Sequence, residues 1–313
     1  MTFFRMLSTK EGWNPRGLHV YITGGSQGLG LALAVLVAKK GAHVSIVART
    51  QSELEKALIE LEVCGTTSSG KRLGSTKAPC LSPTLRRFVG LPTRNSDRMP
   101  LLWILNIRLL LHSKLPAKFH GGRVPDAVFA CAGGWRPMFF PDREERVLTH
   151  EVMVDCHCVQ AFTACAAAER MARERKKGKI ILVSSSLGFL TSVGSWSSDY
   201  PINNDLCLAG SLRAELMVCG IDTYNVFPPS MHTPGLDKEH KMKPAVTRKI
   251  ESADEGLTAE QAASALLKGL NGEPLITGGM IMDPFRAAAR SYAARTNHAT
   301  RPLRENCTDG IGG

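Results

Sequence analysis

The chain has 313 residues, 43% of them hydrophobic and 21% charged, which suits one large α/β domain and excludes a wholly disordered or collagen-like protein. Its net charge of +11 is concentrated between residues 63 and 123, where eleven Lys and Arg accompany a single acidic residue, Asp97. The nine cysteines form no C-x-x-C pair, which favours a reducing compartment over a disulfide framework.

The N-terminal quarter predicts a strand, a helix, a second strand and a second helix. These elements span residues 18–23, 28–41, 42–49 and 51–62. The strands are short apolar runs, and the first helix carries a basic last turn before Gly41. In the second helix, Thr50 and Glu53 have the spacing of a capping box. Two parallel strands joined by a helix are therefore expected here.

The helical and strand patterns stop after residue 62 and resume near residue 125. The later predicted elements are a strand at 125–134, a helix at 143–174, a strand at 178–186, a strand after Gly220 and a capped helix from Thr258. Strands that alternate with helices predict a single Rossmann-like, doubly wound parallel sheet with helices on both faces. We expect one domain over 1–290, with an irregular basic insertion at 63–121 in place of the third-strand region, and a polar tail at 291–313.

The segment after the first strand fits two chemical motifs. Residues 24–28 match G-x-S-x-G, in which Ser26 would be a hydrolase nucleophile. Residues 23–30 match T-G-x-x-x-G-x-G, a variant of the loop that binds a dinucleotide pyrophosphate. Only one strand precedes Ser26, whereas the hydrolase elbow follows a central strand. The position of residues 23–30 directly after the first strand therefore favours a phosphate-binding loop over a hydrolase nucleophile.

The end of the second strand predicts the choice of dinucleotide. An NAD site places an acidic residue near the ribose 2′-hydroxyl, whereas a 2′-phosphate requires a cation. Arg49 occupies this position, and no acidic residue occurs between Gly41 and Gln51. NADPH is therefore the predicted cofactor.

Several motifs together resemble those of the short-chain dehydrogenase/reductase family. They are TGGSQGLG at 23–30, CAGG at 131–134 and ILVSSSLG at 181–188. The segments TYNVFPPSMHTPGL, KPAVTRKIE and GLTAEQAASALLKGL are similar, more narrowly, to the 3-ketodihydrosphingosine reductases. The resemblance implies NADPH-dependent reduction of a long-chain 3-keto base at the cytosolic face of the endoplasmic reticulum.

The resemblance also implies roles for individual residues. Ser185 would polarise the carbonyl, Tyr200 would be a displaced proton donor, and Asp155 would stand where the family has an asparagine. The residues that would surround the dinucleotide are Gly24, Ser26, Gln27, Gly28, Leu29, Gly30, Arg49, Ala132, Gly133 and Thr233.

The chain departs from the family at the catalytic tyrosine and lysine. The tyrosine would fall at position 198, which is Ser198, and none of the four tyrosines has a lysine four residues later. No lysine occurs between Lys179 and Lys238, so one of these two would have to replace the missing group. The alternative function is a catalytically impaired dinucleotide-binding module of the same fold.

The remaining expectations concern partners and location. The most apolar run, at 101–111, is interrupted by Asn106 and Arg108, so we expect peripheral membrane association and no transmembrane helix. The basic segment contains only three aromatic residues, which argues against a nucleic-acid partner. No metal site is expected, and homo-oligomerisation is compatible with the sequence.

Overall fold

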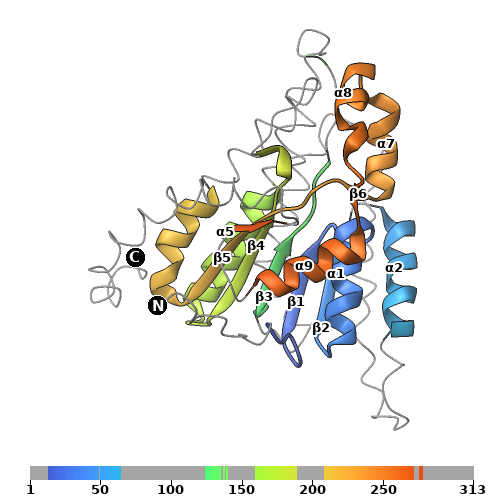
Figure 1. Ribbon diagram of the computed structural model, residues 1–313. Coiled ribbons are helices and arrows are strands. Elements are labelled where there is room, and N and C mark those ends of the chain that lie inside the picture. The colour runs from blue at the N-terminus through green and yellow to red at the C-terminus, as the bar shows by residue number, and fades with distance from the viewer. Residues whose placement is uncertain are drawn as a thin grey trace, which may run out of the picture.

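The computed structural model describes residues 13–48, 50–64, 124–134, 137, 139, 159–188, 208–270 and 275–277. Within these ranges the chain forms a six-stranded sheet in the order β2-β1-β3-β4-β5-β8, and all neighbouring strands run parallel (Figure 1). The strands are β1 (His19–Thr23), β2 (His43–Val47), β3 (Ala127–Ala130), β4 (Gly178–Val183), β5 (Ile221–Phe227) and β8 (Leu275–Thr277). The predicted parallel α/β architecture is confirmed.

Helices pack against both faces of this sheet. The larger helices are α1 (Gly28–Lys39), α2 (Gln51–Cys64), α5 (Val159–Arg173), α9 (Ala259–Gly269) and a helix that includes residues 208–216. One core joins α1, α2 and α9 to side chains such as Ile22 and Phe129, whereas the other joins α5 and the helix at 208–216 to Val128 and Leu182. Since successive strand residues point to opposite faces, the two cores alternate along each strand.

Local sequence explains where the helices begin and end. The helix α1 is composed of Ala, Leu and Val with high helical preference, and Gly41 follows it with a φ of +85°. Thr258 caps α9, because its hydroxyl accepts from the Gln261 backbone N–H at 3.2 Å while the Gln261 side chain accepts from the Thr258 N–H at 2.9 Å. The helix predicted from Thr258 is thereby confirmed.

The strand order creates a crevice at the carboxyl edge of the sheet. The strand β1 has β2 on one side and β3 on the other, so the connections after β1 and β3 leave the sheet in opposite directions. Such a switch point is where open α/β sheets bind ligands. Apart from the end of α2, the predicted insertion at 63–121 lies outside the described residues, as do residues 143–158 of the helix predicted at 143–174.

After β5 the chain leaves the six-stranded sheet and forms a separate segment, residues 231–258, which we call the excursion. Two short strands, β6 (Met231–His232) and β7 (Leu257–Thr258), pair in parallel, and the helices α7 (Pro234–Met242) and α8 (Ala245–Ile250) lie between them in the chain (Figure 1). Lys243 and Glu251 form an ion pair across this excursion, and the Lys243 side chain is only 3% exposed. The excursion is therefore held together by a largely buried ion pair as well as by the pairing of β6 with β7.

Candidate functional site

The loop after β1 lies directly against the turn that follows β3. Gly24 has a φ of +69°, and a Cβ built on it would lie 2.9 Å from both the Ala132 Cα and the Cys131 carbonyl oxygen. The Ala132 N–H donates to the Thr23 hydroxyl at 3.2 Å, which holds the two segments together. A side chain at position 24 would separate them, so the glycine is required by both conformation and space.

The first turn of α1 approaches the same loop from the other side. A Cβ on Gly30 would lie 2.3 Å from the Gly24 carbonyl oxygen, so only glycine allows this contact. Gln27 is the N-cap residue of α1, but its side chain makes no capping hydrogen bond. The first amides of α1 therefore receive no side-chain cap from Gln27, and half-buried Ser26 directly precedes it in the chain. This arrangement of close backbone and uncapped amides fits a pyrophosphate.

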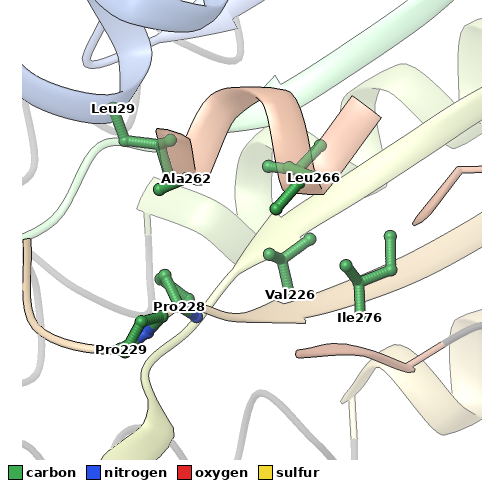
Figure 2. Close-up of a pocket in the computed structure, with 8 residues that line it drawn as sticks. Leu29, Val226, Pro228, Pro229, Ala262, Leu266 and Ile276 are labelled. Atoms are coloured by element: carbon green, nitrogen blue, oxygen red, sulfur yellow. The ribbon is translucent and has the colours of Figure 1, made fainter. Parts of the chain in front are cut away.

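Leu29 has a packing role, since it is only 6% exposed and belongs to the core between α1 and α9. Figure 2 shows Leu29 beside a small apolar cavity, together with residues of α9, β5 and β8 and the proline pair after β5. The cavity volume is about 10 Å³, roughly the least that admits one water molecule. This cavity is too small and too apolar to be a substrate site.

Glu53 connects the first turn of α2 to the glycine loop. One carboxylate oxygen accepts from the Gln27 side-chain amide at 2.9 Å, and the other accepts from the Lys56 ammonium at 2.9 Å. The hydrogen bonds from Lys56 and Gln27 lower the pKa of Glu53 below its ordinary value, and the Lys238 charge adds to this effect. Sequence reasoning placed Glu53 only in a capping box, because nothing local signals a contact 26 residues away.

Ser185 follows β4 at the carboxyl edge of the sheet, close to the end of β5. Its hydroxyl oxygen accepts from the Leu187 backbone N–H at 3.3 Å. The neighbouring Ser186 N–H donates to the Pro228 carbonyl at 3.0 Å, which joins this turn to the segment after β5. The predicted partners Tyr200 and Asp155 lie outside the described residues.

Gln160 in α5 supports the serine-bearing strand and was missed by sequence reasoning. Its side chain is 4% exposed and donates to the Val183 carbonyl at 2.7 Å, directly before the serine turn. A Cβ on Gly133 would lie 4.0 Å from the same amide nitrogen. Gln160 thus sets the spacing between β4 and the turn that holds Ala132 and Gly133. A buried glutamine in a helix carries no sequence signal that distinguishes it from a surface glutamine.

Cys131 begins the turn after β3, and burial raises the pKa of its thiol to about 12. The thiol is therefore neutral near pH 7 and is a weak nucleophile. Its position beside the glycine loop has a packing role.

Thr233 brings the excursion into contact with the glycine loop. It is the N-cap of α7, where its hydroxyl accepts from the Leu236 N–H at 3.3 Å. A Cβ built on Gly28 would lie 3.2 Å from the Thr233 methyl group. The structure thus places two of the predicted cofactor-binding residues side by side.

Arg49 lies outside the described residues, but both lysines proposed as replacements for the missing catalytic lysine are described. Lys179 lies near the amino end of β4, six residues before Ser185 and thus roughly 20 Å along an extended chain. Its ammonium donates to Asp222 at 2.9 Å and to the Tyr224 hydroxyl at 3.0 Å. Burial alone would lower the pKa of Lys179, but these hydrogen bonds outweigh burial and raise the pKa. Lys179 therefore cannot serve beside Ser185.

Lys238 lies on α7 and contributes to the electrostatic attraction at Glu53. Glu53 lies in the first turn of the helix after β2, whereas Ser185 follows β4, and β1 and β3 separate these two strands. Three inter-strand spacings correspond to roughly 14 Å. Lys238 is therefore associated with the β2 side of the crevice.

Two absences hold for the part of the chain that the structure describes. No cluster of three or more His, Cys, Asp or Glu side chains there is arranged to bind a metal ion. None of the helices in the same ranges is long and apolar enough to cross a bilayer.

Comparisons with known proteins agree with this geometry. A family profile described as short chain dehydrogenase matches residues 18–76. The 3-ketodihydrosphingosine reductase of Cryptococcus neoformans is 35% identical over 290 residues, which cover 92% of this chain and 78% of that protein. The 3-ketodihydrosphingosine reductase of Bos taurus is 28% identical over 255 residues, covering 80% of this chain and 68% of that protein. A solved short-chain dehydrogenase from Sphingobium yanoikuyae in complex with NADPH shares the fold, with a TM-score of 0.63, 18% identity and coverage of 94% and 97%.

Proposed function

The chain belongs to the short-chain dehydrogenase/reductase family, and on that premise we propose that it reduces 3-ketodihydrosphingosine to dihydrosphingosine with NADPH. The observation that carries the substrate is the 35% identity to the Cryptococcus neoformans reductase across 92% of this chain. The switch-point crevice with its tightly packed glycine loop supports the dinucleotide.

The proposed cofactor residues lie in four segments of the chain, and each would bind a different part of the dinucleotide. The uncapped amides of α1, near Ser26, would hold the pyrophosphate, and Arg49 would pair with the 2′-phosphate. The turn at 131–134 would border the adenosine and the adjoining ribose, and Thr233 would contact the nicotinamide amide. When bound, the nicotinamide would supply hydride to the ketone carbon.

Side chains of the protein would polarise the ketone group of the substrate and supply the proton that the reduction requires. Ser185 would donate a hydrogen bond to the ketone oxygen from the carboxyl edge of β4, and Tyr200 would be the proton donor. No lysine stands four residues after Tyr200 to favour its phenolate form, so we expect Tyr200 to be a slow acid and base near neutral pH.

A second candidate is a dinucleotide-binding module that turns over slowly or not at all. Two observations favour it. The Y-x-x-x-K motif is absent from the sequence, and Lys179 is held by Asp222 and Tyr224 at the opposite edge of the sheet. In this case the cofactor loop would bind NADPH and the protein would act through partners.

We also propose that the protein associates peripherally with the cytosolic face of the endoplasmic reticulum. The support is the membrane-resident substrate class and the apolar, basic character of residues 101–123. Because each basic residue near an anionic surface contributes about 1 kcal/mol that salt screens, high-salt or carbonate washing should release the protein. Retention after carbonate would contradict peripheral binding.

The two functions are separated by measuring binding and turnover on the same preparation. NADPH titration by calorimetry tests the site, and oxidation of NADPH in the presence of 3-ketodihydrosphingosine tests the reaction. Tight NADPH binding with no turnover would select the binding module. No binding of any dinucleotide would contradict both functions.

The same titration tests the role of Arg49. We expect Arg49→Ala to weaken NADPH binding and leave NADH binding nearly unchanged, because a guanidinium pairs bidentately with a phosphate. Losing a charge-assisted pair of this kind typically costs about 1.5–3 kcal/mol. Equal loss of affinity for both dinucleotides would contradict this role.

A further inference from the structure

A side-chain bridge spans the gap between the glycine loop and the helix that follows β2. Gln27 is the last loop residue before α1, and its amide donates to Glu53 in the first turn of α2 at 2.9 Å. In a dinucleotide fold, the 2′ substituent of the adenosine ribose falls between this loop and the end of the second strand. With a dinucleotide bound, Glu53 would therefore border the position that distinguishes NADPH from NADH.

Glu53 is negatively charged near neutral pH. The groups that face it are the Gln27 amide, the Lys56 ammonium at 2.9 Å and, more weakly, the Lys238 charge from α7. All three stabilise the carboxylate form, which lowers its pKa. These are also the donors that a second anion at the same place would use.

The two dinucleotides would meet this carboxylate differently. A 2′-phosphate would bring further negative charge beside Glu53 and compete with it for Gln27, Lys56 and Lys238. A 2′-hydroxyl carries no charge and can donate a hydrogen bond, and a carboxylate offers about four acceptor positions, of which two are used here. Glu53 thus favours NADH, whereas Arg49 is proposed to favour NADPH.

We propose that Glu53 is a specificity-determining residue of the cofactor site, and that it limits the preference for NADPH over NADH. This inference rests on the proposed function, since it requires a dinucleotide at the glycine loop. Glu53 lies on α2, after Gln51. Sequence reasoning looked for an acidic residue only between Gly41 and Gln51, so it did not consider Glu53 for this role.

The experiment compares two variants of the full chain that each remove one negative charge from α2. Glu53→Gln keeps an oxygen that can accept from Gln27 but removes the charge beside the loop. Glu55→Gln is the matched control, because Glu55 is exposed and accepts from Gln51 on its own helix at 2.8 Å. Dissociation constants for NADPH and NADH are measured by calorimetry for each protein, and the ratio of the two constants is the readout.

We expect Glu53→Gln to raise the preference for NADPH about three- to tenfold, which corresponds to removing one charge a few ångströms from a phosphate in a water-exposed site. The reversed-charge variant Glu53→Lys should raise it further, and Glu55→Gln should leave it unchanged. An unchanged preference in Glu53→Gln, or an equal rise in both single-charge variants, would overturn the inference while leaving the proposed function intact. Wild-type protein that binds neither dinucleotide would overturn the proposed function and the inference with it.

Discussion

Gly30 shows how little space separates the glycine loop from the first turn of α1. A Cβ at this position would lie 2.3 Å from the Gly24 carbonyl oxygen, which is backbone and cannot rotate away as a side chain would. We expect Gly30→Ala to lower the free energy of unfolding by about 1–3 kcal/mol, the usual cost of overpacking, and to abolish dinucleotide binding. Urea unfolding and NADPH titration measure the two effects.

Gly210 provides the matched control. It lies within the helix at 208–216, and a Cβ built on it meets no atom within 4 Å. Gly210→Ala should therefore stabilise the protein by about 0.5–1 kcal/mol through helical preference and leave NADPH binding unchanged. A Gly30→Ala protein as stable as the Gly210→Ala protein would contradict the tight approach of α1 to the loop.

At the scale of elements, the excursion that carries α7 and α8 depends on a buried ion pair. Lys243 is 3% exposed and Glu251 is 22% exposed, so removing the carboxylate would leave an ammonium group largely out of water. We expect Glu251→Ala to cost about 3 kcal/mol, close to the lower end of what breaking a buried pair costs. Urea unfolding measures the global effect, and amide hydrogen exchange of 234–253 locates it.

A second substitution distinguishes the lost charge partner from lost packing. Adding Lys243→Met to Glu251→Ala removes the buried charge, so most of the stability should return. Glu255→Ala is the surface control and should change stability by less than about 0.5 kcal/mol. Equal destabilisation by Glu251→Ala and Glu255→Ala would show that the pair contributes little.

The sequence predicted those elements that carry a strong local pattern. The apolar runs of β1 to β5 and the helices α1, α2, α5 and α9 were all expected, because their side chains are buried with a regular period. The strand β8 was missed because three residues are too few to show a period. The helix α7 was missed because it has no buried residues and so presents no apolar face.

The site was predictable only where one short segment contains the whole signal. The glycine loop and Ser185 are such segments, and the structure places both at the carboxyl edge of the sheet. The bridge between Gln27 and Glu53 and the bond from Gln160 to Val183 join residues 23 or more positions apart. Neither pair shows a periodicity or a spacing rule, so only the folded chain reveals them.

At the scale of the whole molecule, the expected activity of the chain depends on groups that the sequence does not supply. Replacing residues 195–205 so that Ser198→Tyr and Ile202→Lys are both present should raise ketone reduction by about 10² to 10⁴, the usual contribution of a positioned acid/base group. The position of Lys179 at the far edge of the sheet supports this expectation. Turnover under saturating NADPH is the measurement.

Ser185→Ala in the same background is the control. It should remove the gained activity while NADPH binding persists, because Ser185 is proposed to act on the substrate and lies outside the glycine loop. Full reductase activity from the unmodified chain would contradict the expected deficit, and would mean that another residue has taken over the role of the missing lysine.

The short pairing of β6 with β7 has a consequence for how this protein can diversify. Besides the strand pair, the Leu257 N–H donates to the Ser230 carbonyl at 2.8 Å, and the His232 ring is bonded to the Glu255 carbonyl at 2.9 Å. Residues 230–232 are therefore hydrogen-bonded to residues 255–258, and the two ends of the segment 233–256 lie close together. We expect this segment to tolerate changes in length without any change in the strand order of the main sheet, provided that Thr233 stays against Gly28 and Lys238 stays near Glu53.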